Sequence, residues 1–163
     1  MGKKKKVASQ PSDGFKVVAD NRQARFQYSI LDTYEAGIVL EGTEVKAIRA
    51  GKVNLRDGFA LVRDEEAWLF NVHISPHDTA SQHFNHEPRR NRKLLLHKRE
   101  ILKLIGKVEQ DGLTLVPLKM YLKKGYVKVT IGLGKGKKLY DKRQDLKKKQ
   151  DNRDMARALK GSD

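Results

Sequence analysis

The alternation of apolar and polar residues near the start of the chain predicts two strands. Residues 25–31 place Phe26, Tyr28 and Ile30 at every second position, which is the period of a strand with one buried face. Residues 34–40 form a second apolar stretch. This part of the chain is therefore expected to be extended, as two consecutive strands.

A short helix is expected directly after these strands. Thr43 has the hydroxyl side chain typical of an N-cap, and Glu44 would lie in the first turn, next to the positive end of the helix. Val45 and Ile48 are three residues apart, so they share one helical face. Gly51 can adopt the left-handed conformation that often ends a helix. The pattern predicts about two helical turns here.

Two further stretches, 59–62 and 68–74, are expected to pair as a hairpin around residues 63–66. Alternation divides the second strand into two faces. One face would hold Trp68, Phe70, Val72 and Ile74, and the other Leu69, Asn71 and His73. The aromatic rings of this strand, together with Phe26 and Tyr28, are candidate stacking platforms for RNA bases. Their alternation with polar residues favours core packing instead.

The second half of the chain contains one helical pattern and one more hairpin. The apolar residues with helical spacing are Ile101, Leu104, Ile105 and Val108. Residues 113–122 and 126–133 predict the hairpin. Pro117 cannot donate to a strand ladder, so an edge position or a bulge is expected there. Residues 76–92 are polar and unpatterned, which indicates a long loop.

About six short strands and two helices predict a mainly β fold with flanking helices. An OB-like antiparallel barrel is the first expectation, because closure of the sheet removes exposed edges, and an open α+β sheet is the alternative. Residues 1–20 are expected to be a basic flexible N-terminus and residues 21–134 the OB-like barrel. Residues 135–163 are expected to be a basic tail that is disordered until it binds a partner.

The charge of the chain indicates a polyanionic partner. The 163 residues carry 35 Lys and Arg against 20 Asp and Glu, which gives a formal net charge of +15. The most basic segment has almost no apolar face, so nucleic acid fits better than a membrane surface. The chain has no cysteine, no signal-peptide pattern and no apolar run long enough to span a membrane. We therefore expect a cytoplasmic protein without a membrane partner.

The basic tail contains the strongest indication of nucleic-acid binding. From position 135 to position 160 there are 11 basic residues and 4 acidic ones, so this segment carries 11 − 4 = +7. Lys135, Gly136, Lys137 and Lys138 lie beside Tyr140, and this group combines phosphate-binding charge with a ring that can stack on a base. A helix that forms against phosphates is predicted, and a solvated tail without a specific role is the alternative.

Other patterns give little support for catalysis or for a cofactor. The glycines of residues 132–137 lack the spacing of a phosphate-binding loop, and no Ser or Thr follows the lysines. The pairs His73/His77 and His83/His86 have spacings that could hold a metal, but surface histidines explain them better. No nucleophile, base and orienting group form a recognisable set. The sequence predicts no metal, no cofactor and no enzyme; an RNA-cleaving enzyme that uses the histidines stays the alternative class.

Several segments in register resemble the SmpB family, the SsrA-binding proteins. They include Asn-Arg-Gln-Ala-Arg at 21–25, Gly-Thr-Glu-Val-Lys at 42–46, His-Ile-Ser-Pro at 73–76, Arg-Lys-Leu-Leu-Leu-His-Lys at 92–98, Gly-Leu-Thr-Leu-Val-Pro-Leu at 112–118 and Gly-Lys-Lys-Leu-Tyr-Asp-Lys-Arg at 136–143. The likeness covers everything except about the first 20 residues. It is much more specific than any single motif.

The resemblance implies a function in the rescue of stalled ribosomes, called trans-translation. Members of the family have an OB-type barrel and bind the tRNA-like part of transfer-messenger RNA. The implied partners are this RNA and the ribosome, at the decoding region and messenger channel of the small subunit. The elongation factor that delivers aminoacyl-tRNA is a further implied partner. A general OB-type module for single-stranded or ribosomal RNA is the alternative function.

The resemblance also implies particular site residues. Asn21, Glu35 and Leu95 match positions of the family's RNA-binding surface. A turn-forming asparagine, a salt bridge in the barrel and a packed leucine are the structural alternatives. The matching phosphate contacts are Arg25, Arg92 and Lys93. The tail residues that would engage the ribosome are Lys135, Gly136, Lys137, Lys138, Tyr140, Asp141, Lys142 and Arg143.

Overall fold

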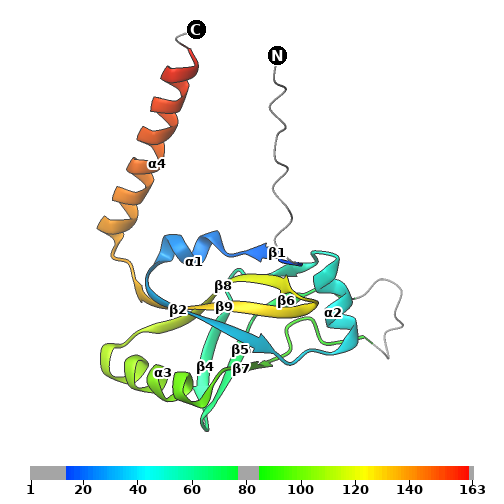
Figure 1. Cartoon of the computed structure of the whole chain (residues 1–163). Coiled ribbons are helices and arrows are strands. Elements are labelled where there is room, and N and C mark those ends of the chain that lie inside the picture. The colour runs from blue at the N-terminus through cyan, green and yellow to red at the C-terminus, as the bar shows by residue number, and fades with distance from the viewer. Residues whose placement is uncertain (1–13, 77–84, 162–163) are drawn as a thin grey trace, which may run out of the picture.

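The computed structural model describes residues 14–76 and 85–161, and these contain nine strands and four helices (Figure 1). In chain order the elements are β1 (Lys16–Asp20), α1 (Arg22–Gln27), β2 (Tyr28–Ile38), α2 (Gly42–Arg49), β3 (Val53–Asn54), β4 (Phe59–Arg63), β5 (Glu66–Phe70), β6 (His73–Ile74), β7 (Arg92–Leu95), α3 (Lys98–Asp111), β8 (Thr114–Lys123), β9 (Tyr126–Gly136) and α4 (Leu139–Lys160). The fold is mainly β with helices, as predicted.

Six of the strands form a closed ring of antiparallel pairings. The order around the ring is β8-β4-β5-β7-β2-β9, and β9 pairs again with β8. β1 pairs with β8 along the edge that faces away from β9. β3 pairs with β6 in a separate two-stranded sheet. The strand pairing between β4 and β8 consists of a single residue pair, Ala60 and Leu115. The ring is therefore weakest between these two strands.

The apolar core fills the inside of this ring. Its buried residues come from strands and helices alike and include Ala36, Leu69, Leu94, Val129, Ile131 and Leu133 from the strands and Ile48 and Leu104 from α2 and α3. The helical face predicted around position 104 is confirmed, since Ile101 and Leu104 are buried in α3. The predicted irregularity at Pro117 is also confirmed, because the register between β8 and β9 shifts after this residue.

The first predicted strand is partly wrong, because residues 22–27 form the helix α1. Asn21 caps this helix by accepting a hydrogen bond from the backbone N–H of Ala24. Ala24 packs with Val116 and Leu118 in a small second core cluster. The apolar alternation continues from Phe26 into β2, so it did not reveal the turn of helix before it. The cap and the packing of Ala24 decide the conformation here.

The short helix α2 is where it was expected, but its N-cap is Glu41 and not Thr43. The Glu41 carboxylate accepts from the backbone of the third helical residue, Glu44, and the Glu44 carboxylate accepts from the backbone N–H of Glu41 at 2.8 Å. This reciprocal pair satisfies two unpaired donors. Gly51 follows the helix with a φ of 75°, as predicted for its end.

The second predicted strand of the first hairpin is interrupted at Asn71, which has a φ of 58°. β5 ends at Phe70 and β6 begins at His73. The interruption changes the alternation, so Leu69 points to the core while Trp68 and Phe70 face outward and are half-buried. The prediction that Trp68 and Phe70 share a face with Ile74 in the core is therefore wrong.

The basic tail forms the helix α4, which projects away from the ring (Figure 1). None of its residues is buried. Its first half contacts α1 through the Lys149 ammonium, 5.7 Å from the centre of the Phe26 ring, and Asp145 forms an ion pair with Lys137 in the preceding segment. β9 continues to Gly136, two residues beyond the predicted boundary at 134. That the tail orders only on binding stays a prediction.

Candidate nucleic-acid interface

Glu35 lies in the middle of β2 with its carboxylate on the outer surface of the ring. The hydroxyl of Tyr121 on β8 donates a hydrogen bond to Glu35 Oε2, and Lys123 Nζ lies 3.4 Å from Oε1. The Glu35 side chain is 43% exposed, so it can still accept from a partner. The hydrogen bond from Tyr121 lowers the pKa of Glu35, and Lys123 adds to this effect. Glu35 is thus a fixed, ionised acceptor.

Aromatic and basic side chains surround this carboxylate. The rings of Phe15 and Tyr121 lie 4.8 Å apart, and Lys119 Nζ lies 5.7 Å from the centre of the Tyr121 ring. Burial, together with the hydrogen bond to Glu35, raises the pKa of Tyr121 to about 12, so its hydroxyl remains a donor at neutral pH. We call Glu35, Tyr121, Lys123, Lys119 and Phe15 the Glu35 site. Tyr121 is buried and positions the carboxylate, whereas Phe15 is exposed. A fixed acceptor beside an exposed ring and cations suits an RNA contact.

Leu95 belongs to the same outer face. It is opposite Gly37 in the pairing of β7 with β2, and Glu35 is two residues from Gly37 along β2. Side chains two residues apart point to the same face of a strand. Leu95 is 53% exposed, so the interpretation as a packed leucine does not hold. The structure brings Glu35 and Leu95 together on one surface.

Asn21, by contrast, uses its side chain inside the protein. Its amide nitrogen donates to the backbone carbonyls of Leu55 at 3.2 Å and Pro117 at 2.9 Å, and its oxygen caps α1. Only 4% of the residue is exposed. These bonds connect α1 to two other segments of the chain, so Asn21 has a role in the fold. A contact of Asn21 with RNA stays a prediction.

The expectation that Arg92 contacts phosphate needs correction, because this side chain is fully buried. Its guanidinium is paired with the buried carboxylate of Glu44 and donates to the carbonyl of Val72 at 2.8 Å. Burial raises the pKa of Glu44, but hydrogen bonds from Glu41, Arg90 and Arg92 outweigh burial, and the net shift is downward. An arginine enclosed in this way cannot reach a phosphate. We therefore leave Arg92 out of the interface.

Arg25 and Lys93 are accessible to a phosphate. Arg25 lies on α1 and forms an exposed ion pair with Asp20 at 3.4 Å. Lys93 lies on β7 and forms a partly exposed pair with Glu66 at 3.0 Å. Exposed ion pairs of this kind are weak and exchange readily for a stronger anion. Both cations can therefore leave their partners when RNA binds.

The tail residues lie at the junction of β9 and α4. Lys135 and Gly136 are the last residues of β9, and the backbone N–H of Lys137 donates to the carbonyl of Gln27 at 2.8 Å. Lys138 precedes the helix, and Tyr140 is 70% exposed within it. Asp141, Lys142 and Arg143 follow in the first turns of α4. The chain thus has two candidate surfaces, the Glu35 site on the ring and the start of α4.

The histidines that the structure describes do not gather around a metal site. His86 is buried and not on the surface as expected, and its two ring nitrogens lie 2.8 Å from Thr43 Oγ1 and 2.8 Å from the carbonyl oxygen of Ile74. His77 and His83 lie outside the described residues. Among the described residues no three His, Cys, Asp or Glu side chains form a metal-binding group, and no helix is long and apolar enough to cross a membrane.

Sequence reasoning missed most of the side chains around Glu35. Tyr121, Lys119 and Phe15 were not among the predicted site residues, although all three contact one another. The bulge after Pro117 changes which residues of β8 face outward, so simple alternation could not place Tyr121 beside Glu35. Lys119, two residues before Tyr121, and the polar tip of Tyr121 were the available signals in β8.

Comparison with known proteins gives a consistent family assignment. The family model described as SmpB protein matches residues 18–161. An SsrA-binding protein of Nostoc punctiforme is 70% identical over 152 residues, covering 93% of this chain and 98% of that protein. An SsrA-binding protein of Synechocystis sp. is 74% identical over 145 residues, covering 89% of this chain and 94% of that protein.

A solved structure also resembles this chain. It is described as "tmRNA-SmpB: a journey to the center of the bacterial ribosome", and its matching chain is 56% identical, with a TM-score of 0.63. The match covers 76% of this chain and 85% of the other. The family model and the listed relatives each cover most of the chain. The protein therefore belongs to the SmpB family.

Proposed function

We propose that this protein binds the tRNA-like domain of transfer-messenger RNA and delivers it to stalled ribosomes for trans-translation. The observation that carries the proposal is the 70–74% identity to SsrA-binding proteins over most of the chain. The similarity to the SmpB chain of a tmRNA complex supports it. The action is recognition and positioning without bond-making, and it would take place in the cytoplasm.

We infer further that the ring of six strands is an OB-like barrel. The closed order of antiparallel pairings supports this, since a barrel requires that the last strand pairs with the first. The single pair between β4 and β8 would be its loosest seam. On this proposal the barrel is the rigid support that fixes the distance between Glu35 on β2 and Tyr121 on β8.

The two candidate surfaces suggest a division of labour. The Glu35 site with Leu95 would recognise the folded RNA. A fixed acceptor and an exposed apolar side chain can distinguish one RNA surface from another, whereas charge alone attracts every RNA. Arg25 and Lys93 would contact its phosphates. The start of α4 and the helix behind it would enter the messenger channel of the small subunit. The elongation factor that delivers aminoacyl-tRNA would be a further partner.

A direct test compares two RNAs of equal length, the tRNA-like domain and an unstructured RNA, over a range of salt concentrations. Specific recognition predicts that the preference for the folded RNA persists as salt rises, because charge–charge attraction is screened while hydrogen bonding and shape are not. Equal affinity for the two RNAs at every salt concentration would favour a general RNA-binding module. RNA cleavage during the incubation would favour the enzyme alternative.

A further inference from the structure

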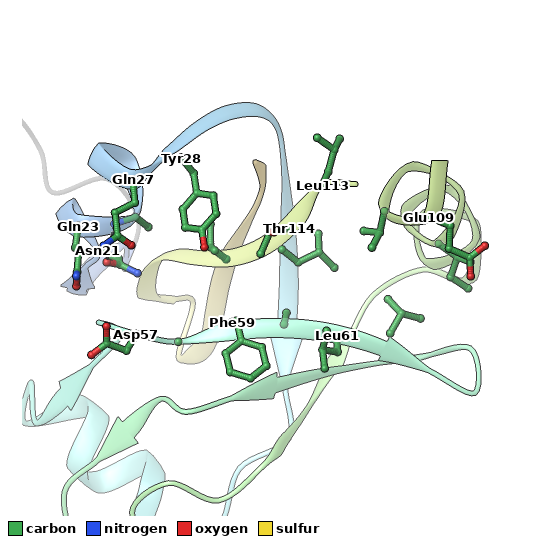
Figure 2. Close-up of a pocket in the computed structure, with 18 residues that line it drawn as sticks. Asn21, Gln23, Gln27, Tyr28, Asp57, Phe59, Leu61, Glu109, Leu113 and Thr114 are labelled. Carbon is green, nitrogen blue, oxygen red and sulfur yellow. Dashed lines mark hydrogen bonds between the residues drawn. The ribbon is translucent and has the colours of Figure 1, made fainter. Parts of the chain in front are cut away.

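A pocket of about 460 Å³ lies between α1, β4, α3 and β8, away from the Glu35 site (Figure 2). It forms because β4 and β8 pair only at Ala60 and Leu115 and separate on either side of this pair. Neither Glu35 nor Tyr121 lines it, and no lysine or arginine is among the described residues that do. Its size and mainly apolar lining with a few polar groups are those of a site for a small ligand.

Two aromatic rings lie on different walls of the pocket. Figure 2 shows Tyr28 above β4, with its hydroxyl directed toward the strand, and Phe59 on β4 below it. Phe59 is 38% exposed, and its ring stacks on Phe70 at 5.4 Å with an interplanar angle of 8°. This support from Phe70 fixes the orientation of the Phe59 ring. A flat heteroaromatic ring that enters the pocket can therefore stack on a surface that is already ordered.

Polar groups at one end of the pocket offer acceptors at its edge and a cation beside it. Asp57 and Gln27 line the pocket, and no described residue forms a hydrogen bond with either side chain. The backbone carbonyl of Asp57 accepts from Asn71 at 3.1 Å, which holds the loop in place. Gln23, also in the lining, accepts from Arg56 Nε at 2.7 Å and so places an exposed guanidinium beside the pocket.

We propose that this pocket binds one guanine nucleotide that is unstacked from a bound RNA. The two adjacent donors of guanine, N1–H and the N2 amino group, match the two oxygens of the Asp57 carboxylate, while the base stacks on Phe59. The absence of cations among the described lining residues disfavours a phosphate inside. The phosphate would stay outside, on Arg56. The inference rests on the proposed RNA-binding function and adds a base-specific contact to it.

The test uses the full-length protein and guanosine 5′-monophosphate (GMP) as the probe, followed by NMR chemical shifts. We expect saturable shifts at Tyr28, Asp57 and Phe59, and weaker binding of the adenosine, cytidine and uridine monophosphates. Shifts confined to other surfaces, or equal affinity for the four nucleotides, would overturn the inference. Binding of the tRNA-like RNA is measured in parallel. If this RNA binds while GMP does not, only the pocket inference fails; if this RNA does not bind, the proposed function fails.

Two conservative variants assign the roles. Asp57 has a φ of 65°, a conformation that asparagine tolerates well, so Asp57→Asn should fold normally. It should weaken GMP binding about tenfold and abolish the preference over the adenosine nucleotide, because one charged hydrogen bond is lost. Arg56→Gln should weaken GMP but not guanosine, which has no phosphate. Tyr126→Ala, in an exposed position on β9, is the control and should change neither. If Asp57→Asn keeps the guanine preference, the assignment is wrong.

Discussion

Glu35 and Glu44 show how burial separates a residue that serves the fold from one that can serve a partner. Both carboxylates accept hydrogen bonds from side chains of the protein, and both have a lowered pKa. Glu44 is fully enclosed with Arg92, and every contact of the pair is internal. Glu35 remains 43% exposed beside Lys123. Residue type and charge are therefore poor guides to function at these positions, and exposure decides.

At Glu35 we predict that Glu35→Ala weakens binding of the tRNA-like RNA about tenfold. Loss of a negative charge alone would tighten binding to a polyanion, but loss of an accepted hydrogen bond outweighs that gain. Glu66→Ala removes an equally exposed carboxylate, from the pair with Lys93, and is the matched control. It should leave binding unchanged or slightly tighter. If both variants behave alike in a filter-binding titration, Glu35 has no specific contact.

The pH dependence of this effect follows from the lowered pKa of Glu35. The ordinary pKa of a glutamate is 4.5, and the hydrogen bond from Tyr121 lowers the pKa of Glu35 below this value. The Glu35 carboxylate therefore stays ionised when the pH falls to the ordinary glutamate pKa. A lowered pKa means that the contribution is present above the ordinary value and is lost only below it. The difference in RNA affinity between wild type and Glu35→Ala should thus be constant from about pH 8 to about pH 5. A loss of the difference near pH 6 would contradict this.

At Arg92 we predict an effect on stability and not on RNA recognition. Arg92→Met leaves the Glu44 carboxylate buried with one partner fewer, and removal of one member of a buried ion pair typically costs about 3–5 kcal/mol. Urea unfolding should show this loss, whereas Arg89→Met, an exposed arginine nearby, should change stability by less than about 0.5 kcal/mol. The folded Arg92→Met protein should bind RNA as wild type does. Weaker binding without a loss of stability would reinstate Arg92 as a contact.

Among the elements, those with a long and regular pattern were predictable from the sequence. β9 alternates Val127, Val129 and Ile131 with polar or small residues, and the structure has a continuous strand there. The two-residue strand β3 was missed, because two residues show no period, and β6 was predicted only as the end of a longer strand. The break at Asn71 depends on one positive φ. Features that depend on a single backbone angle or a distant partner leave no periodic signal.

Only single residues of the candidate site were predictable, because strand pairing brings the others together and leaves no periodic signal in the sequence. Glu35 and Leu95 were identified by resemblance, and the structure places both on one outer face. Tyr121 and Phe15 are far from Glu35 in the sequence, and they reach it through the pairings of β8 with β9 and β1. Register of this kind is set by the bulge after Pro117 and by the closed ring. It cannot be read from one strand alone.

For the element α4 we predict that the rest of the protein folds without it. A truncation after Lys138 keeps all of β9 and the backbone bond from Lys137 to Gln27, and removes a helix without buried residues. The loss of stability should be below about 1 kcal/mol, the typical value of the surface ion pair between Lys137 and Asp145. Urea unfolding measures this value. A truncated protein that is unfolded would show that α4 is part of the domain.

The same truncation separates the two surfaces functionally. We expect it to bind the tRNA-like RNA with a modest loss and a shallower dependence of affinity on salt, because some phosphate contacts disappear with the basic tail. It should fail to support tagging on stalled ribosomes. Loss of most of the RNA affinity would contradict the division of labour between the Glu35 site and α4.

At the scale of the whole molecule, the positive charge is divided between the ring of strands and the exposed helix α4. The net charge is +15, and residues 135–160 account for +7 of it, so +8 remains for the rest of the chain. The ring offers a rigid surface, while α4 projects from it with its side chains exposed (Figure 1). A protein of this shape can hold one RNA on the ring while the helix reaches a second. Its total charge sets the strength of attraction, and the arrangement sets which RNA lies where.

We predict that α4 acts through the order of its residues and not only through its charge. Scrambling residues 139–149 at constant composition keeps the charge and leaves Gly136 and Lys137 in their contacts with the ring. If α4 enters the channel in one register, Lys142 and Arg143 meet particular phosphates, and Tyr140 stacks at one position. A short isolated helix is marginal in water, so the channel must supply stabilising contacts, and these depend on order. In a reconstituted tagging assay, the scrambled protein and Lys142→Ala/Arg143→Ala should both lose tagging while they still bind the tRNA-like RNA. Normal tagging by the scrambled protein would reduce α4 to a charged tether.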